Sequence, residues 1–191
     1  YHGNPAIAPA NIEKDGYNFN WDQGFAQVIS NLNIHPVYTP ITYNITYNLN
    51  GGNNHVDNPE TYNVETPTIT LAPASKAGFT FDGWYNALDQ KVEEITLGST
   101  GAITLTAKYT INPVTVAISG NAPLTYGEGD ITLSADLTSE LVDPEISYAW
   151  TKDGVAHAST KQIVLNKVAD SDTYKVVVTV TKDGQTTTAN A

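Results

Sequence analysis

An internal repeat is the sequence feature that most constrains the fold of this chain. Residues 31–39 (NLNIHPVYT) align without a gap to residues 102–110 (AITLTAKYT). Upstream, the segment GYNFNWD that starts at Gly16 matches GFTFDGWY, which starts at Gly78, with one residue fewer. Because self-similar segments fold as copies of one supersecondary unit, we expect two copies of a single strand-and-turn plan. The first copy matches only the later half of the second.

Alternation of apolar and polar residues indicates that the repeated unit is built from β-strands. In the second copy apolar residues recur at every second position, at Tyr43, Ile45, Tyr47 and Leu49. This period of two places them on one face of a strand, and Gly51-Gly52 then favours a turn. Further strands are expected around residues 61–64, 68–71, 78–85 and 103–109. Abundant Thr, Val, Ile and Tyr agree with a mainly β chain.

The second copy resembles a known bacterial repeat. Its segments NLNGG, GFTFDGWY and ITLTAKY together are similar to the Listeria–Bacteroides repeat, the B-repeat type of internalin-like surface proteins. The resemblance covers about residues 39–110 in full and residues 1–38 in part. It implies a small β-grasp-like module that occurs in tandem on exported bacterial proteins. The first copy departs from the pattern, because no Gly precedes Trp21.

From about residue 111 onward the sequence pattern changes and predicts a β-sandwich. Short alternating strands are separated by turn sequences, among them two Lys-Asp-Gly turns at 152–154 and 182–184. Strands at such short spacing are typical of two packed antiparallel sheets. The run ADSDTYKV around Tyr174 resembles the tyrosine corner of immunoglobulin-like domains, and Trp150 followed by Lys-Asp-Gly resembles their strand C. A fibronectin-type sandwich is the alternative.

We therefore expect an all-β chain with three segments: a partial repeat at 1–38, a complete β-grasp-like repeat at 39–110, and an immunoglobulin-like β-sandwich at 111–191. The predicted core residues of the repeat are Leu49, Phe81, Trp84, Leu105 and Tyr109, with Trp84 beside Phe79 or Phe81. Those of the sandwich are Ala135, Trp150, Tyr174 and Val176. The immunoglobulin resemblance implies that Ala135 and Val176 replace the inter-sheet cysteine pair. It also implies that the Tyr174 hydroxyl bonds to backbone near residues 167–170.

The residues that carry chemistry are not arranged for catalysis or metal binding. The four histidines, at 2, 35, 55 and 157, are not spaced as metal ligands. Cys and the G-x-S-x-G pattern are absent, and Glu93 and Glu94 are neighbours that would face opposite sides of a strand. Two acidic pairs, Asp170 with Asp172 and Glu128 with Asp130, lie outside any EF-hand pattern. We expect no enzyme activity, no cofactor, and no catalytic or metal site.

Two other kinds of site are disfavoured by the sequence. Trp21, Trp84, Tyr85 and Trp150 are candidates for a sugar-stacking platform, but Trp21 and Trp84 recur at one place in both copies, which favours a core role. An intramolecular Lys–Asn crosslink would favour a lysine on the first strand of the sandwich. Residues 111–120 contain no lysine.

Charge and composition limit the partners of the chain and its location. The net charge of −11 disfavours binding to nucleic acid or to anionic lipid surfaces. No apolar run approaches the ~20 residues that span a bilayer, and the absence of Met predicts a segment of a longer protein.

The expected function is that of an extracellular, monomeric stalk or spacer module of a bacterial surface protein, with a possible contribution to adhesion. The alternatives are a module that binds a host protein or cell-surface glycan, and an accessory region of a secreted polysaccharide-degrading enzyme.

Overall fold

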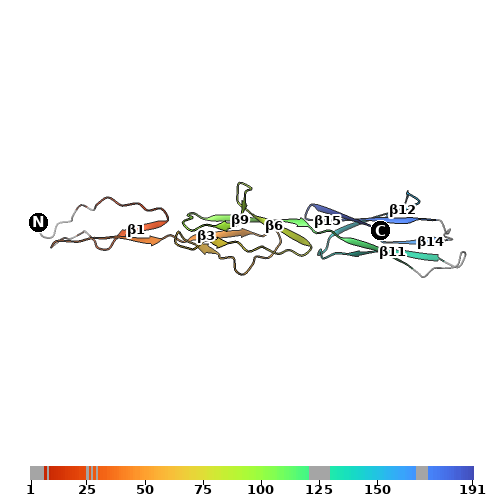
Figure 1. Cartoon of the computed structure of the whole chain (residues 1–191), viewed down its shortest axis with the longest axis horizontal. Coiled ribbons are helices and arrows are strands. Elements are labelled where there is room, and N and C mark those ends of the chain that lie inside the picture. Colours follow the sequence, from red (N-terminus) through yellow and green to blue (C-terminus); the bar gives the residue numbers. More distant parts are fainter. Residues whose placement is uncertain are drawn as a thin grey trace. The chain divides into compact units, whose positions relative to one another are not determined.

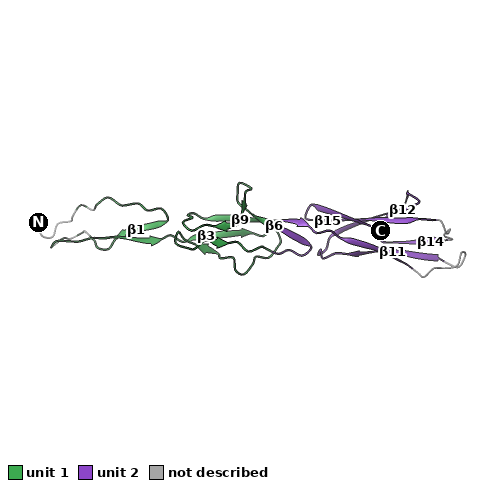
Figure 2. Cartoon of the chain, viewed as in Figure 1, with its two compact units in different colours: residues 1–74, 83–108 green, residues 75–82, 109–191 purple. Residues whose placement is uncertain are grey.

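The chain is built from β-strands joined by turns (Figure 1). The computed structural model describes residues 7, 9–24, 26, 28, 30–120, 130–166 and 172–191, and these contain no helix. The prediction of an all-β fold is confirmed. The chain divides into two compact units, residues 1–74 with 83–108 and residues 75–82 with 109–191 (Figure 2).

The first copy of the repeat forms a two-stranded antiparallel sheet. Strand β1 (Tyr17–Trp21) pairs with β2 (Pro36–Pro40), and Phe19 lies opposite Tyr38. The Tyr38 ring meets the rings of Tyr17 and Phe19 edge-on, with centroids 6.0 and 5.5 Å away. Aromatic packing on one face therefore joins the two strands.

The second copy contributes a five-stranded sheet with the order β4-β3-β9-β6-β7. Its strands are β3 (Tyr43–Asn48), β4 (Thr61–Tyr62), β6 (Phe79–Tyr85), β7 (Lys91–Val92) and β9 (Ile103–Ile111). Strands β3 and β9 run parallel, and the other strands lie between them in sequence, as a parallel pair requires a long connection. Two further short strands, β5 (Ile69–Thr70) and β8 (Glu94–Ile95), pair antiparallel.

Trp84 is the largest fully buried residue of this second copy, with 1% of its surface exposed. Its ring meets Tyr47 edge-on at a centroid distance of 5.0 Å, and its indole Nε1 donates to the Ala72 carbonyl at 2.9 Å. Leu105 is fully buried, and Leu49 is half-buried. The alternation of β3 therefore does place its apolar face inward, while the loop carbonyl satisfies the polar edge of the tryptophan.

A second aromatic group forms around Tyr109. The half-buried Phe81 and the buried Phe79 contact the Tyr109 ring edge-on, with centroids 5.7 and 6.5 Å away. These three rings correspond in sequence to Phe19, Tyr17 and Tyr38 of the first copy. The two copies therefore share the same arrangement of aromatic rings as well as a similar sequence.

Two antiparallel sheets make up the sandwich, with the orders β10-β11-β14 and β13-β12-β15-β16. Their strands are β10 (Thr115–Gly120), β11 (Asp130–Thr138), β12 (Glu145–Lys152), β13 (Val155–Ala158), β14 (Gln162–Asn166), β15 (Tyr174–Lys182) and β16 (Gln185–Asn190). Strand β13 pairs with β12 and forms one edge of the four-stranded sheet. The prediction of a β-sandwich is confirmed.

Both Lys-Asp-Gly sequences form two-residue hairpin turns. Asp153 and Gly154 have φ of 49° and 82°, and Asp183 and Gly184 have φ of 50° and 75°. Positive φ at both central positions is the type I′ conformation, whose twist matches that of paired strands. The Asp-Gly pairs therefore fix the registers of β12 with β13 and of β15 with β16.

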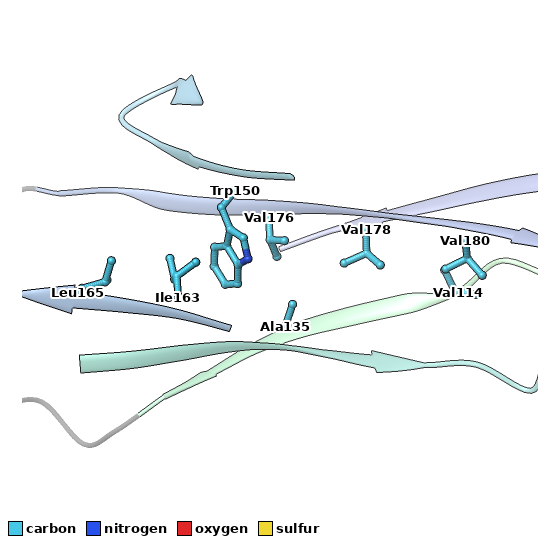
Figure 3. Packing of buried hydrophobic residues seen from close by; sticks show 8 residues of the cluster. All are labelled: Val114, Ala135, Trp150, Ile163, Leu165, Val176, Val178 and Val180. Carbon is cyan, nitrogen blue, oxygen red and sulfur yellow. The ribbon is translucent and has the colours of Figure 1, made fainter. Parts of the chain in front are cut away.

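The core of the sandwich lies between its two sheets (Figure 3). Trp150 is 1% exposed, and Ala135 and Val176 are fully buried. Figure 3 shows Trp150 and Val176 on one sheet pointing toward Ala135 on the facing sheet. The half-buried Tyr174 packs against the same cluster. The backbone predicted to accept its hydroxyl, residues 167–170, lies outside the described residues.

Candidate functional site

Each copy of the repeat holds a lysine over the aromatic rings beside its first aromatic strand. In the first copy the Lys14 ammonium lies 3.8 Å from the Tyr17 ring centroid and 5.4 Å from that of Tyr38. In the second, the Lys76 ammonium lies 4.5 Å from Phe79 and 5.3 Å from Tyr109. Cations at these distances are attracted by the electron-rich ring face.

These lysines did not emerge from the search of the sequence for chemistry. The signal was present, because both copies contain Lys-x-Gly followed by an aromatic residue. A lysine in a turn is ordinarily a solvated surface residue. Lys14 and Lys76 differ from that ordinary case only because aromatic rings pack beneath their ammonium groups.

The Lys76 ammonium also binds a carboxylate. Its Nζ lies 2.7 Å from Asp183 Oδ2, and only 12% of the Lys76 side chain is exposed. The hydrogen bond from Lys76 lowers the pKa of Asp183 below its ordinary value. Because the ammonium contacts both a carboxylate and two rings, it serves as a structural contact between the turn and the residues around it.

The three described histidines lie apart from one another. His35 is exposed and pairs with Asp22, its Nδ1 lying 3.0 Å from Asp22 Oδ2 while its backbone N–H donates to Oδ1 at 2.9 Å. This backbone hydrogen bond is the main reason why the pKa of Asp22 is lowered. His55 lies 3.5 Å from Asp57, and the His157 ring stacks edge-on against Tyr174. His2 lies outside the described residues.

The acidic candidates are likewise dispersed. Glu93 and Glu94 are both exposed, and Glu93 lies 3.8 Å from the Lys91 ammonium. Asp172 binds Lys152 at 2.9 Å, which raises the pKa of Lys152. Glu128 and Asp170 lie outside the described residues. Among the residues that the structure describes, no group of three His, Asp or Glu side chains is placed to hold a metal ion.

The aromatic candidates for a sugar platform separate into buried and partly exposed residues. Trp84 and Trp150 are each 1% exposed, so neither ring face is available for stacking. Trp21 and Tyr85 are half-buried, and the Lys108 ammonium lies 4.3 Å from the Tyr85 ring centroid. The four rings therefore do not form one exposed surface.

Surface pockets large enough for a small molecule include one in the first copy of the repeat, of about 340 Å³, lined by Ile7, Val28, Leu32 and Ile34 among others, and two further along the chain. Of the latter two, one, of about 370 Å³, is lined by Asn86, Val92, Glu94, Ile95, Ser99 and Ile103, among others. The other, of about 290 Å³, lies beside Gly78, between residues 112–115 and 138–141. Each of these two contains a single carboxylate, Glu94 or Glu140, and no histidine or lysine.

In the described part of the chain, no helix is long and apolar enough to cross a membrane.

Comparison with known proteins identifies part of the chain. Residues 43–108 match the model of the Listeria–Bacteroides repeat domain. The prediction that the second copy is a repeat of this kind is therefore confirmed.

A longer relative matches more of the sequence. A Gly-rich membrane protein of Evansella cellulosilytica is 28% identical to this chain over 159 residues. The match covers 75% of this chain but only 18% of that protein, so the chain spans a small part of its relative. Among solved structures, the crystal structure of the N-terminal four Ig domains of Dscam1 isoform 6.9 aligns with 78% of this chain and 42% of its own, at 14% identity and a TM-score of 0.29.

Proposed function

We propose that the chain is a non-catalytic array of β-modules in an exported bacterial surface protein, and that it acts as a spacer between other parts of that protein. Its modules are the partial repeat at 1–38, the repeat at 39–110 and the immunoglobulin-like sandwich at 111–191. The repeat type at residues 43–108 and the match to a much longer membrane protein support this location.

The observation that carries the proposal is that buried Trp and Asn side chains form hydrogen bonds with the backbone of loops. Trp84 and Trp150 each bury a ring and donate an indole N–H to a loop carbonyl. Asn58, which is 6% exposed, donates to the Ala72 carbonyl at 2.9 Å and accepts from its N–H at 2.8 Å. These groups fasten loops to sheets, which gives a module stability rather than a reactive surface.

Replacement of the segment within the full-length surface protein tests the spacer role. One variant deletes the segment, and a second replaces it with the same number of unrelated β-sandwich modules. Antibody access to a tag on the part of the protein beyond the segment is then measured on intact cells. A spacer predicts that deletion reduces access and that the replacement restores it.

Adhesion of the same cells to host protein or glycan is measured as well, because it can contradict the spacer proposal. If the unrelated modules restore tag access but adhesion to host protein or glycan is lost, residues 1–191 themselves carry a binding site and the spacer proposal is wrong. Saturable binding of the purified chain to a glycan array would lead to the same conclusion.

A further inference from the structure

The two copies of the repeat make the same backbone contact at equivalent positions. The Gly16 carbonyl accepts from the N–H of Ile41 at 2.8 Å, and the Gly78 carbonyl accepts from the N–H of Asn112 at 2.9 Å. Ile41 and Asn112 each lie three residues after the closing tyrosine of their copy, Tyr38 or Tyr109. The turn at residues 14–16 or 76–78, which we call the docking turn, thus bonds to the first residues of the next module in sequence.

Both glycines of the docking turns lie against that next module. A Cβ on Gly16 would lie 2.8 Å from Val64 Cβ, within unit 1. A Cβ on Gly78 would lie 2.5 Å from Leu141 Cδ2 and 2.9 Å from the Leu141 backbone nitrogen, within unit 2. Their φ values of 80° and 76° also favour glycine. Gly98, whose φ is 90°, has no such neighbour within 4 Å.

Side chains reinforce each contact, and they differ with the module that follows. In unit 1 the Tyr17 hydroxyl donates to Glu65 Oε1 at 2.8 Å. In unit 2 Lys76 binds Asp183, and the Gln185 amide donates to the Tyr109 carbonyl at 2.6 Å and accepts from the Ile111 N–H at 2.7 Å. The contacts made by the glycine and its carbonyl are the same in both copies, whereas the side-chain contacts differ.

We propose that the docking turn is a portable joint: each repeat presents it to the module that follows in the chain, whether that module is another repeat or a β-sandwich. The part of the contact that both copies share is made by backbone and glycine, and this part needs little side-chain complementarity from the following module. The lysine above the rings holds the turn against its own strands. This inference stands independently of the spacer function.

Distance measurements between spin labels on the whole chain test the joint. The sequence has no cysteine, so labels attach only at Ser75→Cys, beside the docking turn, and at Val155→Cys, two exposed positions that both lie within unit 2. In the otherwise unchanged chain we expect one narrow distance distribution. Gly78→Ala should broaden it, because the added Cβ displaces Leu141. Gly98→Ala is the matched control, since it carries a similar backbone strain without a contact, and should leave the distribution narrow.

A second variant keeps the test decisive if Gly78→Ala unfolds the repeat. Gln185→Ala lies in the sandwich, leaves the turn intact, and removes two hydrogen bonds to the backbone of Tyr109 and Ile111. It should also broaden the distribution while circular dichroism stays unchanged. A broad distribution in the parent chain, or a narrow one in a folded Gln185→Ala or Gly78→Ala variant, would overturn the proposal.

Discussion

Each of the two buried tryptophans fills the core of its module and also needs a hydrogen-bond acceptor for its indole N–H. Trp84 and Trp150 each place a large ring in a core and direct the indole N–H to a loop carbonyl, of Ala72 at 2.9 Å and of Thr160 at 2.8 Å. An unpaired N–H in either core would cost about 1–3 kcal/mol. Each tryptophan therefore links a strand to a loop in addition to filling the core.

Truncation of Trp84 should destabilise the repeat strongly. Trp84→Ala removes a ring that is 1% exposed, and such truncations cost roughly 3–5 kcal/mol in free energy of unfolding. Tyr85→Ala, at the half-buried neighbouring position, is the control and should cost less. Urea unfolding followed by circular dichroism measures both. Equal and small losses for the two variants would mean that the core lies elsewhere.

Alkaline pH should weaken the fold through a few buried tyrosines. Burial raises the pKa of Tyr47 to about 12 and also raises the pKa of Tyr62 and Tyr109. Because the folded pKa of Tyr47 exceeds its unfolded value of about 10, its contribution to stability is complete below pH ~10 and is lost as the pH rises toward ~12.

A phenolate absorbance titration with and without Tyr47→Phe checks this expectation. The substitution should remove part of the phenolate signal that appears only at the highest pH. Ionisation of all tyrosines in one ordinary step while the chain is still folded would contradict it.

At the scale of elements, the longer strands of the second copy were predicted from their period of two, and the two-residue strands β4 and β5 lie within the expected segments 61–64 and 68–71. Residues 43–49, 78–85 and 103–109 all correspond to observed strands, because alternation reports burial of one face. Strands β7, β8 and β13 were missed. Strands of two to four residues show no measurable period, and their pairing depends on partners that sequence alone does not reveal, such as Ile69 opposite Ile95.

The first copy shows how a missing neighbour changes a strand. Its alignment with the second copy predicted a strand over residues 31–39, but β2 begins only at Pro36. In the second copy the matching residues, Ile103 to Thr106, pair with β3. The described part of the first copy has no counterpart of β3, so residues 32–35 lack the ladder that would extend them.

The candidate site was the least predictable part of the chain. Lys-x-Gly is visible twice in the sequence, but its role depends on contacts with residues far along the chain, such as Leu141 and Asp183. No local pattern encodes those partners. The inward position of Trp84, by contrast, was predicted from its recurrence in both copies and from alternation, and that of Trp150 from the resemblance of its segment to an immunoglobulin strand.

Neighbouring valines of β15 should respond differently to truncation. Val176 is fully buried between the sheets, whereas Val177 is 43% exposed on the outer face. Val176→Ala should lower the free energy of unfolding by roughly 2 kcal/mol through lost burial and a cavity, and Val177→Ala by about 0.5 kcal/mol or less. Thermal unfolding of both variants measures the difference. The reverse order would show that the register of β15 is shifted by one residue.

At the scale of the whole molecule, the acidic side chains of the described residues form no group placed to hold a metal ion. Calcium or zinc should therefore leave the melting temperature of the chain unchanged, because a ligand that binds only the folded state would raise it. Differential scanning calorimetry with and without each ion makes the comparison, with a chelator as control. A rise of several degrees with calcium would show that the acidic segments form a site.

Mechanical unfolding of single molecules tests most directly whether the chain is a tandem array of separately cored modules. With the chain held by its two ends, we expect two main unfolding steps, one for the repeat and one for the sandwich, each releasing on the order of 20–25 nm of chain at about 0.35 nm per residue. Trp84→Ala should weaken only the first module and Val176→Ala only the second. A single cooperative step, or weakening of both modules by either substitution, would contradict the modular organisation on which the spacer proposal depends.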